Sequence, residues 1–526
     1  MGAKRASSDS PGSPCSIGGD RLVCFETVGA LMARNKGQST EDSSGDSRER
    51  VATQPAPQLR PPAEPGIEPR IETDHFGTVE IAGDRHWGPQ TQRSLEHFRI
   101  GQPRFVFTRP VIRAFGMVKR SAALANRELG LLPSRHADAI ARAANEVVNG
   151  ELDDHFPLVV FQTGSGTQTN MNANEVVASR ANEILGFARG LKHPVHPNDH
   201  VNRSQSSNDV FPTVMHLALV EEVNGTLEPP VGQLRTTLED LSVRYASVVM
   251  VGRTHLQDAT PVTFGQQISD WVAQIDLAWT MVMEACHHLG ELAIGATAVG
   301  TGLNAPPGFG AAVAADLAAV TGTPYRQATN LFAALSSHHA VVSLSSGLRT
   351  LGSALMKMAN DVRWLSSGPR AGIGELVLPA NEQGSSIMPG KVNPTQAEAL
   401  LMVVAQVIGN DATVAFAGTQ GNFQLNVAKP VMLHNVLESI GLLADACGSF
   451  DAHCASGMRP HVKTMSAHLA RSLMTATALT PRIGYEAAAE IANYANEHDL
   501  DLRAAALHLG MSPGDFDAWV VPEEMT

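Results

Sequence analysis

The 526-residue chain has no run of about 18 to 20 apolar residues free of charges and helix breakers, so we expect no membrane-spanning helix. It also has no excess of basic residues: 39 Lys and Arg stand against 52 Asp and Glu, a formal net charge of -13. This balance disfavours nonspecific nucleic-acid binding but allows a local basic pocket for a small anion. The 43% hydrophobic content supports a large core, and the length predicts more than one domain.

Cysteine is scarce, and none of the cysteines forms a CxxC pair. The five positions are Cys15, Cys24, Cys286, Cys447 and Cys454. This spacing excludes a disulfide framework, a zinc site and a four-cysteine iron–sulfur pattern. It fits a reducing compartment, and we expect a cytoplasmic protein.

The first 70 residues differ in composition from the rest of the chain. Ser7–Pro14 and Glu41–Arg50 are polar and turn-prone, and Pro55–Pro69 is proline-rich. Such segments cannot bury enough apolar surface to offset the entropy of ordering, so residues 1–70 are predicted to form a disordered extension. The alternative is a start codon assigned too far upstream, with Met32 as one candidate start.

Helical periodicity dominates from Ile71 onward. Apolar residues recur at spacings of three and four over 231–245 and 268–286, and a third pattern, rich in small residues, runs over 331–365. Small residues let long helices approach closely, which predicts a mostly α fold with a long-helix bundle, some neighbours of which could come from other subunits. Strand signals are weak because aromatic residues make up only 5%, and His155–Gln162 is one short candidate strand.

A glycine-rich polar segment occupies 161–176, FQTGSGTQTNMNANEV. Gly164 and Gly166 permit sharp turns on either side of Ser165, and Thr167 follows. The hydroxyls could hold water or carboxylate oxygens, although such a motif alone more often forms a simple turn.

A second polar segment, HPNDHVNRSQSSNDVFPT, spans 196–213. Ser206, Ser207 and Asn208 precede an apolar helix, so Ser207 or Asn208 is expected to cap it. Because a helix N-terminus also attracts anions, capping and ligand binding are compatible there. His196 with Asn198 and Asp199 could form a separate polar pocket, although a single histidine there is more often structural.

The segment Gly252–Gln266, GRTHLQDATPVTFGQ, carries Thr254 and His255 ahead of a long helix. A lone histidine in this position is more often structural than catalytic. Glu398 is a potential partner, and a carboxylate that orients an imidazole fixes its tautomer and raises its basicity.

The loop Gly384–Pro394 reads GSSIMPGKVNP. Its glycines give hinge freedom and its prolines limit it, which suits a lid that closes over a substrate. Lys391 and Asn393 offer a cation and an amide to a carboxylate, and Ser385 and Ser386 add hydroxyls. The loop therefore predicts an enzyme that eliminates water, or a similar small group, beside a carboxylate.

In this order, the four segments resemble the fumarase/aspartase superfamily, and HPND, SSNDVFPT and Gly390 make them similar to class II fumarases. The similarity runs from WGPQTQRSLEHFRIG to the C-terminal RIGYEAAAEIA and DFDAWVVPEEM. It implies a three-domain fumarase/aspartase-like fold whose central bundle assembles into a tetrameric helical core. The implied domains are an N-terminal helical domain (71–207), a central helix bundle (208–462) and a small C-terminal domain (463–526).

The resemblance also implies the reaction, since fumarases interconvert fumarate and L-malate in the tricarboxylic acid cycle. Ser385 would be the base that forms an aci-carboxylate intermediate, while His255, oriented by Glu398, would handle the water. The implied substrate- and water-binding residues are Ser165, Gly166, Thr167, Ser206, Ser207, Asn208, Thr254, Ser386, Lys391, Val392 and Asn393. The implied second dicarboxylate site is His196, Pro197, Asn198 and Asp199.

Because the chemistry moves only protons and water, the resemblance implies no metal or organic cofactor. Its implied partners are the two dicarboxylates and three further copies of the chain, with each active site shared between chains, and neither nucleic acid nor membrane. The closest alternative is an ammonia-lyase acting on aspartate, which shares the carbanion chemistry. The residues Ser206–Asn208 favour water as the leaving group. A non-catalytic structural protein on the same fold is disfavoured because Ser385, His255 and Lys391 are all present.

Overall fold

A computed structural model describes residues 68–526 of the chain. The predicted extension 1–70 and the alternative start at Met32 therefore lie outside the described residues, except for positions 68–70. Arg70 already opens the first strand, β1.

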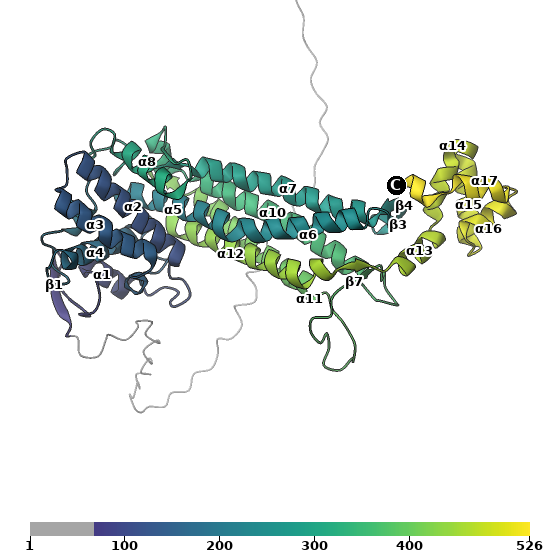
Figure 1. Ribbon diagram of the computed structural model, residues 1–526, viewed down its shortest axis with the longest axis horizontal. Coiled ribbons are helices and arrows are strands. Elements are labelled where there is room, and N and C mark those ends of the chain that lie inside the picture. The colour runs from purple at the N-terminus through teal and green to yellow at the C-terminus, as the bar shows by residue number, and fades with distance from the viewer. Residues whose placement is uncertain (1–67) are drawn as a thin grey trace, which may run out of the picture. The chain divides into compact units, whose positions relative to one another are not determined.

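A strand pair and the helices α1 to α5 form the first part of the described chain (Figure 1). β1 and β2 are antiparallel, with Arg70 opposite Ile81. The elements are β1 (Arg70–Asp74), β2 (Gly77–Ile81), α1 (Pro89–His97), α2 (Arg109–Glu128), α3 (Ser134–Asn149), η1 (Asp153–His155), α4 (Thr167–Ile184), η2 (Pro197–Val201), α5 (Ser207–Glu222) and η3 (Val223–Leu227).

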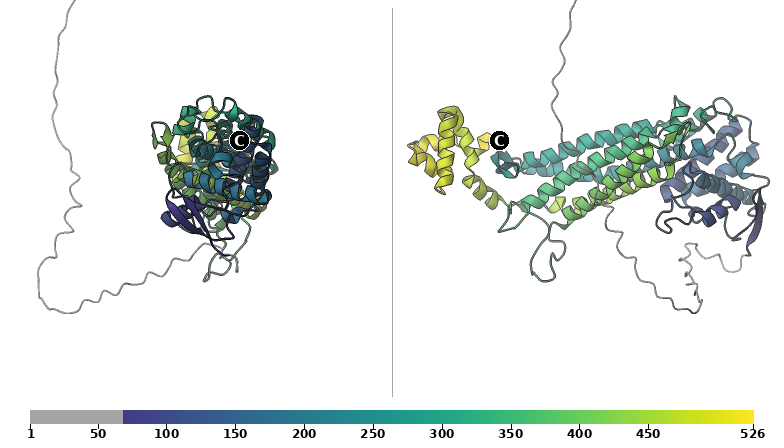
Figure 2. Two further views of the ribbon diagram at one scale, coloured as in Figure 1. Left: turned by 90° about the vertical axis from the view of Figure 1, so that its left-hand side faces the viewer. Right: turned by 180° about the vertical axis from the view of Figure 1, so that it is seen from behind.

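Long helices running side by side follow (Figures 1 and 2). α10 packs against α7 and α11, α11 against α12, and α6 against both α7 and α12. The elements are α6 (Glu228–Arg244), β3 (Val249–Thr254), β4 (Gln257–Thr263), α7 (Phe264–Leu289), β5 (Glu291–Leu292), α8 (Phe309–Thr321), β6 (Arg326–Gln327), α9 (Leu331–Ser336), α10 (His339–Leu365), β7 (Leu376–Val377), α11 (Thr395–Gly418), β8 (Gly421–Asn422), β9 (Leu425–Asn426) and α12 (Lys429–His453).

The C-terminal elements have a small core of their own. Ala476, Leu479, Ile491 and Phe516 belong to a buried cluster separate from the main one. The elements are η4 (Ala455–Gly457), β10 (Arg459–Pro460), α13 (Val462–Arg471), η5 (Leu473–Leu479), α14 (Thr480–Ile483), α15 (Tyr485–Glu497), α16 (Leu502–His508), α17 (Pro513–Trp519) and η6 (Pro522–Met525).

The main core runs without interruption from Val79 in β2 to Met465 in α13. The first helices and the long-helix bundle therefore share one apolar interior, which extends to Met465 of α13, whereas the elements from η5 onward have a separate core. The predicted domain boundaries at 207/208 and 462/463 stay predictions, although α5 and α13 begin within a residue of them.

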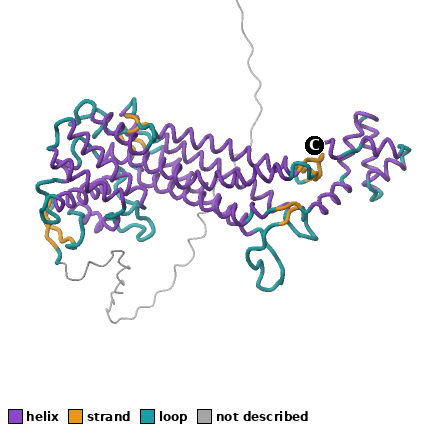
Figure 3. The backbone as a smooth tube through the Cα atoms, viewed as in Figure 1, coloured by secondary structure: helices purple, strands orange, loops and turns teal. Residues whose placement is uncertain are grey.

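The mostly α prediction is confirmed, and the described strands are short, as Figure 3 shows. The patterns over 231–245 and 268–286 correspond to α6 and α7. The single helix expected over 331–365 was wrong, because Ser337 is extended and divides α9 from α10. The candidate strand His155–Gln162 was also wrong: only Val159 forms an isolated bridge, to Val106.

Helix α11 is the one described helix that is long and apolar enough to cross a membrane, by length and composition alone. Core helices of soluble proteins pass the same test. In α11, Asn410 and Asp411 are buried and hydrogen-bond with Ser439 of α12 and Ser345 of α10. These polar contacts are those of a packed helix in a bundle.

Candidate active site

The N-terminus of α5 presents the polar cluster Ser206–Asn208. Ser206 is the N-cap: its Oγ accepts the Asn208 backbone N–H at 3.2 Å, and Asp209 closes a capping box by accepting the Ser206 N–H at 2.9 Å. The expectation that Ser207 or Asn208 caps the helix was therefore wrong by one or two residues. Since the cap uses the Ser206 oxygen as an acceptor, its hydroxyl proton remains available to a ligand.

Asp209 anchors this helix end from behind. Its buried carboxylate also accepts the backbone N–H groups of Gly295 at 3.0 Å and Thr297 at 2.8 Å. Burial raises the pKa of Asp209 to about 6, while these backbone donors act in the opposite direction. Asn208 is fixed as well, because its Nδ2 donates to the Ala298 carbonyl at 2.8 Å, which leaves Oδ1 as an acceptor.

The glycine turn before α4 lies against α5. Gly166 is the N-cap with φ of 75°, and a Cβ there would lie 2.1 Å from the Phe211 ring. A Cβ on Gly164 would lie 1.3 Å from the Val427 carbonyl oxygen. Only glycine fits both positions, and the turn brings the Ser165 and Thr167 hydroxyls within 2.7 Å of each other.

Thr254 and His255 lie at the tip of the β3–β4 hairpin, where His255 and Leu256 have φ of 58° and 60°. Non-glycine residues rarely adopt these angles, so the turn is strained in a way common at functional sites. The preceding Arg253 donates two hydrogen bonds to Glu375, each 2.8 Å. The Glu375 side chain is fully buried, and His468 of α13 lies 2.8 Å from it.

The loop Gly384–Pro394 is largely exposed and holds itself together. Ser385 Oγ accepts the backbone N–H groups of Ile387 at 3.3 Å and Met388 at 3.2 Å. Asn393 Nδ2 donates to the Gly384 carbonyl at 2.8 Å. The second half of the loop, from Lys391 to Pro394, lines a pocket with Glu398 and the end of α10.

One chain joins only some of the predicted residues. Asn170 of α4 donates to Ser207 Oγ at 2.9 Å, so the 165–167 and 206–208 clusters are neighbours. Among residues 68–526, no hydrogen bond joins His255 to Glu398, and neither residue contacts Ser206–Asn208 through one. Figure 1 shows why the hairpin does not reach the Ser206–Asn208 cluster: the β3–β4 hairpin lies at one end of α6 and α7, and α2–α5 lie toward the other.

The predicted second site, His196–Asp199, lies at the edge of a pocket. His196 is the N-cap of η2, and its Nδ1 accepts the N–H groups of Asn198 and Asp199, each at 3.2 Å. The ring's Nε2 is therefore its outward donor. His196, Pro197 and Asn198 line a pocket together with Thr167 and Lys192, so the first and second predicted sites adjoin.

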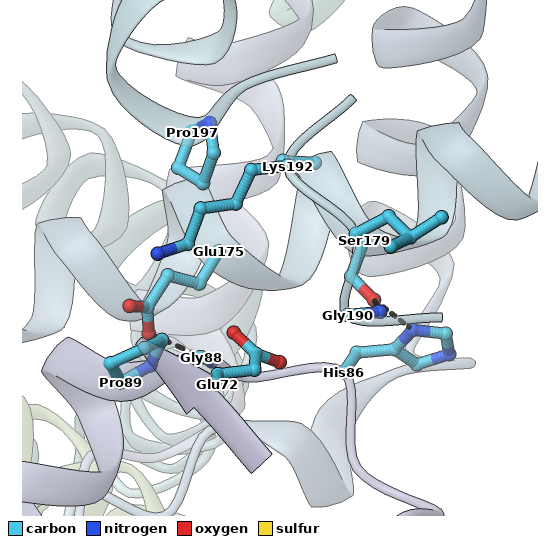
Figure 4. A pocket seen from close by; sticks show the side chains of 11 residues that line it. Glu72, His86, Gly88, Pro89, Glu175, Ser179, Gly190, Lys192 and Pro197 are labelled. Atoms are coloured by element: carbon cyan, nitrogen blue, oxygen red, sulfur yellow. Dashed lines mark hydrogen bonds between the residues drawn. The ribbon is translucent and has the colours of Figure 1, made fainter. Parts of the chain in front are cut away.

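A neighbouring pocket, shown in Figure 4, shares Lys192, Pro197 and Glu175. The Glu175 carboxylate is already satisfied, since it accepts the N–H groups of Gly88, Gln90 and Thr91 at the start of α1. Glu175 therefore anchors the start of α1 and leaves little acceptor capacity for a ligand in this pocket.

Three groups near the site were not among the predicted residues: Lys119, Lys192 and the Arg253–Glu375 ion pair. Lys119 and Glu375 are fully buried. Burial lowers the pKa of Lys119 to about 7, although Asp209 opposes this. The only signal for Lys119 in the sequence was the Lys119–Arg120 pair that interrupts the apolar pattern of α2. In the described part of the chain, no three His, Cys, Asp or Glu residues lie close enough together to hold a metal ion, and the absence of a metal stays a prediction.

Known proteins show the same architecture. Residues 77–409 match the family described as Lyase, and residues 476–526 match the family described as Fumarase C C-terminus. The chain therefore belongs to this lyase family and is an enzyme, as predicted.

Individual relatives show to which group within the lyase family the chain belongs. The chain is 58% identical over 457 residues to fumarate hydratase class II of Thermus thermophilus, and 56% identical to fumarate hydratase class II 1 of Pseudomonas aeruginosa. Each alignment covers 87% of this chain and 98% of the relative. A class II fumarase from Schistosoma mansoni superposes with a TM-score of 0.86 at 40% identity, covering 87% and 99% of the two chains. Within the lyase family, the chain belongs with the class II fumarate hydratases, and the predicted resemblance is confirmed.

Proposed function

We propose that the chain catalyses the reversible addition of water to fumarate, giving L-malate. The observation that carries the proposal is the 58% identity to a class II fumarate hydratase over nearly its whole length, together with the intact set of predicted side chains. A place in the tricarboxylic acid cycle is part of the proposal.

The difficult step is removal of a weakly acidic proton beside a carboxylate, which builds a dianionic aci-carboxylate. Ser385 is the proposed base, although a serine hydroxyl is a very weak base in water. The two amides that donate to its Oγ support the role, because they would stabilise the alkoxide in a closed, dry site. Lys391 and Asn393 would hold the carboxylate that takes up charge, with Thr254 and Ser386 assisting.

His255 would accept a proton from water during hydration and protonate the leaving hydroxyl during dehydration, with Glu398 orienting its ring. Ser165, Thr167 and Asn208 would hold the water, while Ser206 and Ser207 would bind substrate. The free Oδ1 of Asn208 suits this role because it can accept a water proton. The reaction needs no metal or organic cofactor, since it moves only protons and water.

The proposed assembly is a homotetramer with active sites shared between chains. Two observations support it: a single chain leaves the predicted residues in separate groups, and α11 exposes Met402 and Phe416, 69% and 70% accessible. Large apolar side chains exposed on a long bundle helix are typical of surfaces covered by another subunit.

The second dicarboxylate site at His196–Asp199 and a cytoplasmic location are also proposals. The three described cysteines, Cys286, Cys447 and Cys454, are free and buried, which fits a reducing compartment. Fractionation of the source cells would test the location.

A spectrophotometric assay on the purified protein tests the reaction. Fumarate absorbance should appear from L-malate and not from L-aspartate. Absorbance from L-aspartate alone would make the protein an ammonia-lyase, and absorbance from neither would refute the proposal.

A further inference from the structure

Lys119 of α2 lies behind the Ser206–Asn208 cluster with its side chain fully buried. Its Nζ donates to Asn202 Oδ1 at 3.1 Å and to Gln205 Oε1 at 3.0 Å. Charged or neutral, the lysine amine has at least two N–H donors, and both amides turn their oxygens toward it. Their NH₂ groups point away and donate to backbone carbonyls of residues 201–205.

The same direction of donation continues toward the site. Asn202 Oδ1 also accepts Asn170 Nδ2 at 3.3 Å, and that nitrogen donates to Ser207 Oγ at 2.9 Å. Asn170 keeps this orientation although its own Oδ1 is buried without a hydrogen-bond partner among the described residues. The reverse orientation would set the Asn170 and Asn202 oxygens against each other, which costs more than one unpaired acceptor.

Ser207 stands at the end of this chain as an acceptor, so its single hydroxyl proton is left to point at a ligand. We propose that Lys119 is a positioning residue: it fixes the polarity of the chain Lys119–Asn202–Asn170–Ser207 so that the Ser207 hydroxyl donates to a substrate carboxylate. The inference rests on the proposed function, which supplies the dicarboxylate.

Ser206 provides an internal contrast. Its Oγ accepts the Asn208 N–H of its own helix end, so its polarity is set by the capping turn and is independent of Lys119. Removing the Lys119 amine would let Asn202 turn its NH₂ toward Asn170. Asn170 would then present its oxygen to Ser207, and the Ser207 proton would be consumed inside the protein.

A double-mutant cycle tests the proposal. Lys119→Met keeps most of the side-chain volume without a donor, and it is combined with Ser207→Ala, measuring kcat/KM for fumarate. Each single change should lower kcat/KM by about 10- to 100-fold, mainly through KM, the loss of one hydrogen bond to a charged group. The kcat/KM of the double variant should lie within about threefold of that of the less active single variant, because both changes remove the same donated hydrogen bond.

The matched control is the cycle of Lys119→Met with Ser206→Ala, in which the two losses should multiply. Multiplying losses in both cycles would mean that Lys119 has only a general structural role, which overturns the proposal. If Lys119→Met does not fold, Asn202→Leu breaks the same chain and must show the same coupling to Ser207. Asn202→Asp keeps an acceptor for both neighbours but loses the hydrogen bond to the Gln205 carbonyl, so its kcat/KM should fall less than that of Asn202→Leu; an equal loss would contradict the proposal.

Separate results would refute the proposed function and the role of Lys119. Wild-type protein that does not hydrate fumarate refutes the proposed function. The same cycles are then read in the Kd of succinate, a non-reacting dicarboxylate, by calorimetry. Coupling to Ser207 in Kd would support the inference without the reaction, whereas wild-type protein that binds no succinate would overturn both.

Discussion

The Ser206–Asn208 cluster and the loop Gly384–Pro394 are both rich in serine and asparagine, yet they are held in different ways. The cluster is fixed from behind by the buried Asp209 carboxylate and by Asn170. The hydrogen bonds of the loop lie mainly within the loop itself, and Ile387 at its tip is 83% exposed.

This difference assigns the two parts of the proposed reaction, substrate binding and proton abstraction, to different segments. The cluster is preorganised to bind water and carboxylate, since its donors and acceptors already point in fixed directions. The loop carries the proposed base and the cation that must close over the substrate, and closing requires hinge freedom. In the proposed function, binding is thus built into one chain, whereas proton abstraction would require loop closure and neighbouring chains.

The largest effect is expected from a change in the loop Gly384–Pro394. Ser385→Ala removes the proposed base and should lower kcat by about 10²- to 10⁴-fold, the usual contribution of a positioned acid or base. Because the side chain bonds only within an exposed loop, the unfolding midpoint should not change. Steady-state kinetics and thermal unfolding check both. Ser386→Ala is the control and should lose less; near-normal turnover in Ser385→Ala would contradict the assignment.

A second change breaks the ion pair between Arg253 of the β3–β4 hairpin and Glu375, which directly precedes β7. Glu375→Gln leaves Arg253 without its buried carboxylate, which should lower the free energy of unfolding by about 3–5 kcal/mol. Activity should fall too, since Arg253 adjoins Thr254 and His255. Urea unfolding measures the loss. Asp517→Asn, in the exposed pair with Arg503, should leave stability unchanged; equal effects would contradict a special role for Glu375.

A third change disturbs the glycine turn before α4, which lies beside the Ser206–Asn208 cluster. A Cβ at Gly164 would overlap the Val427 carbonyl, so Gly164→Ala should destabilise the protein by about 1–3 kcal/mol through a forced backbone shift. The shift would displace Ser165 and Thr167 and lower kcat/KM by about 10²-fold. Gly232→Ala in α6 meets nothing within 4 Å and should be neutral or stabilising. A Gly164→Ala variant as active as Gly232→Ala would show that the turn is not rigid.

The smallest effect concerns pH. Burial lowers the pKa of Lys119 to about 7 from the ordinary lysine value of 10.5, so the unfolded chain binds more protons between these values. The contribution of Lys119 to stability is therefore full above the unfolded pKa and is lost as pH falls through the folded one. The urea midpoint of the wild type, relative to that of Lys119→Met, should therefore rise from about pH 7 to about pH 10. The exposed Lys463→Met should show a constant difference, and a constant difference for Lys119→Met would contradict the burial argument.

Much of the bundle was predictable because α6 and α7 carry sustained helical periodicity. The break at Ser337 was not, since small polar residues are compatible with both a helix and its interruption. Periodicity also could not show that α2–α5 and the long helices share one core, because that depends on tertiary packing.

The candidate site was predictable as a set of residue types and not as a geometry. Serines, asparagines and Lys391 stand out as chemistry in the sequence. The Lys119 chain and the Arg253–Glu375 pair do not, because each joins residues far apart in sequence through buried hydrogen bonds. The pairing of His255 with Glu398 stays a prediction, since one chain leaves these residues apart.

Subunit complementation tests the division of the site most directly. His255→Asn and Ser385→Ala variants, each inactive alone, are unfolded, mixed in equal amounts and refolded together. If the hairpin and the loop of one site come from different chains, the mixture should recover about a quarter of wild-type activity through random pairing of intact segments. A mixture no more active than its components, from a mixed oligomer of the same size as the wild type, would contradict a site shared between chains.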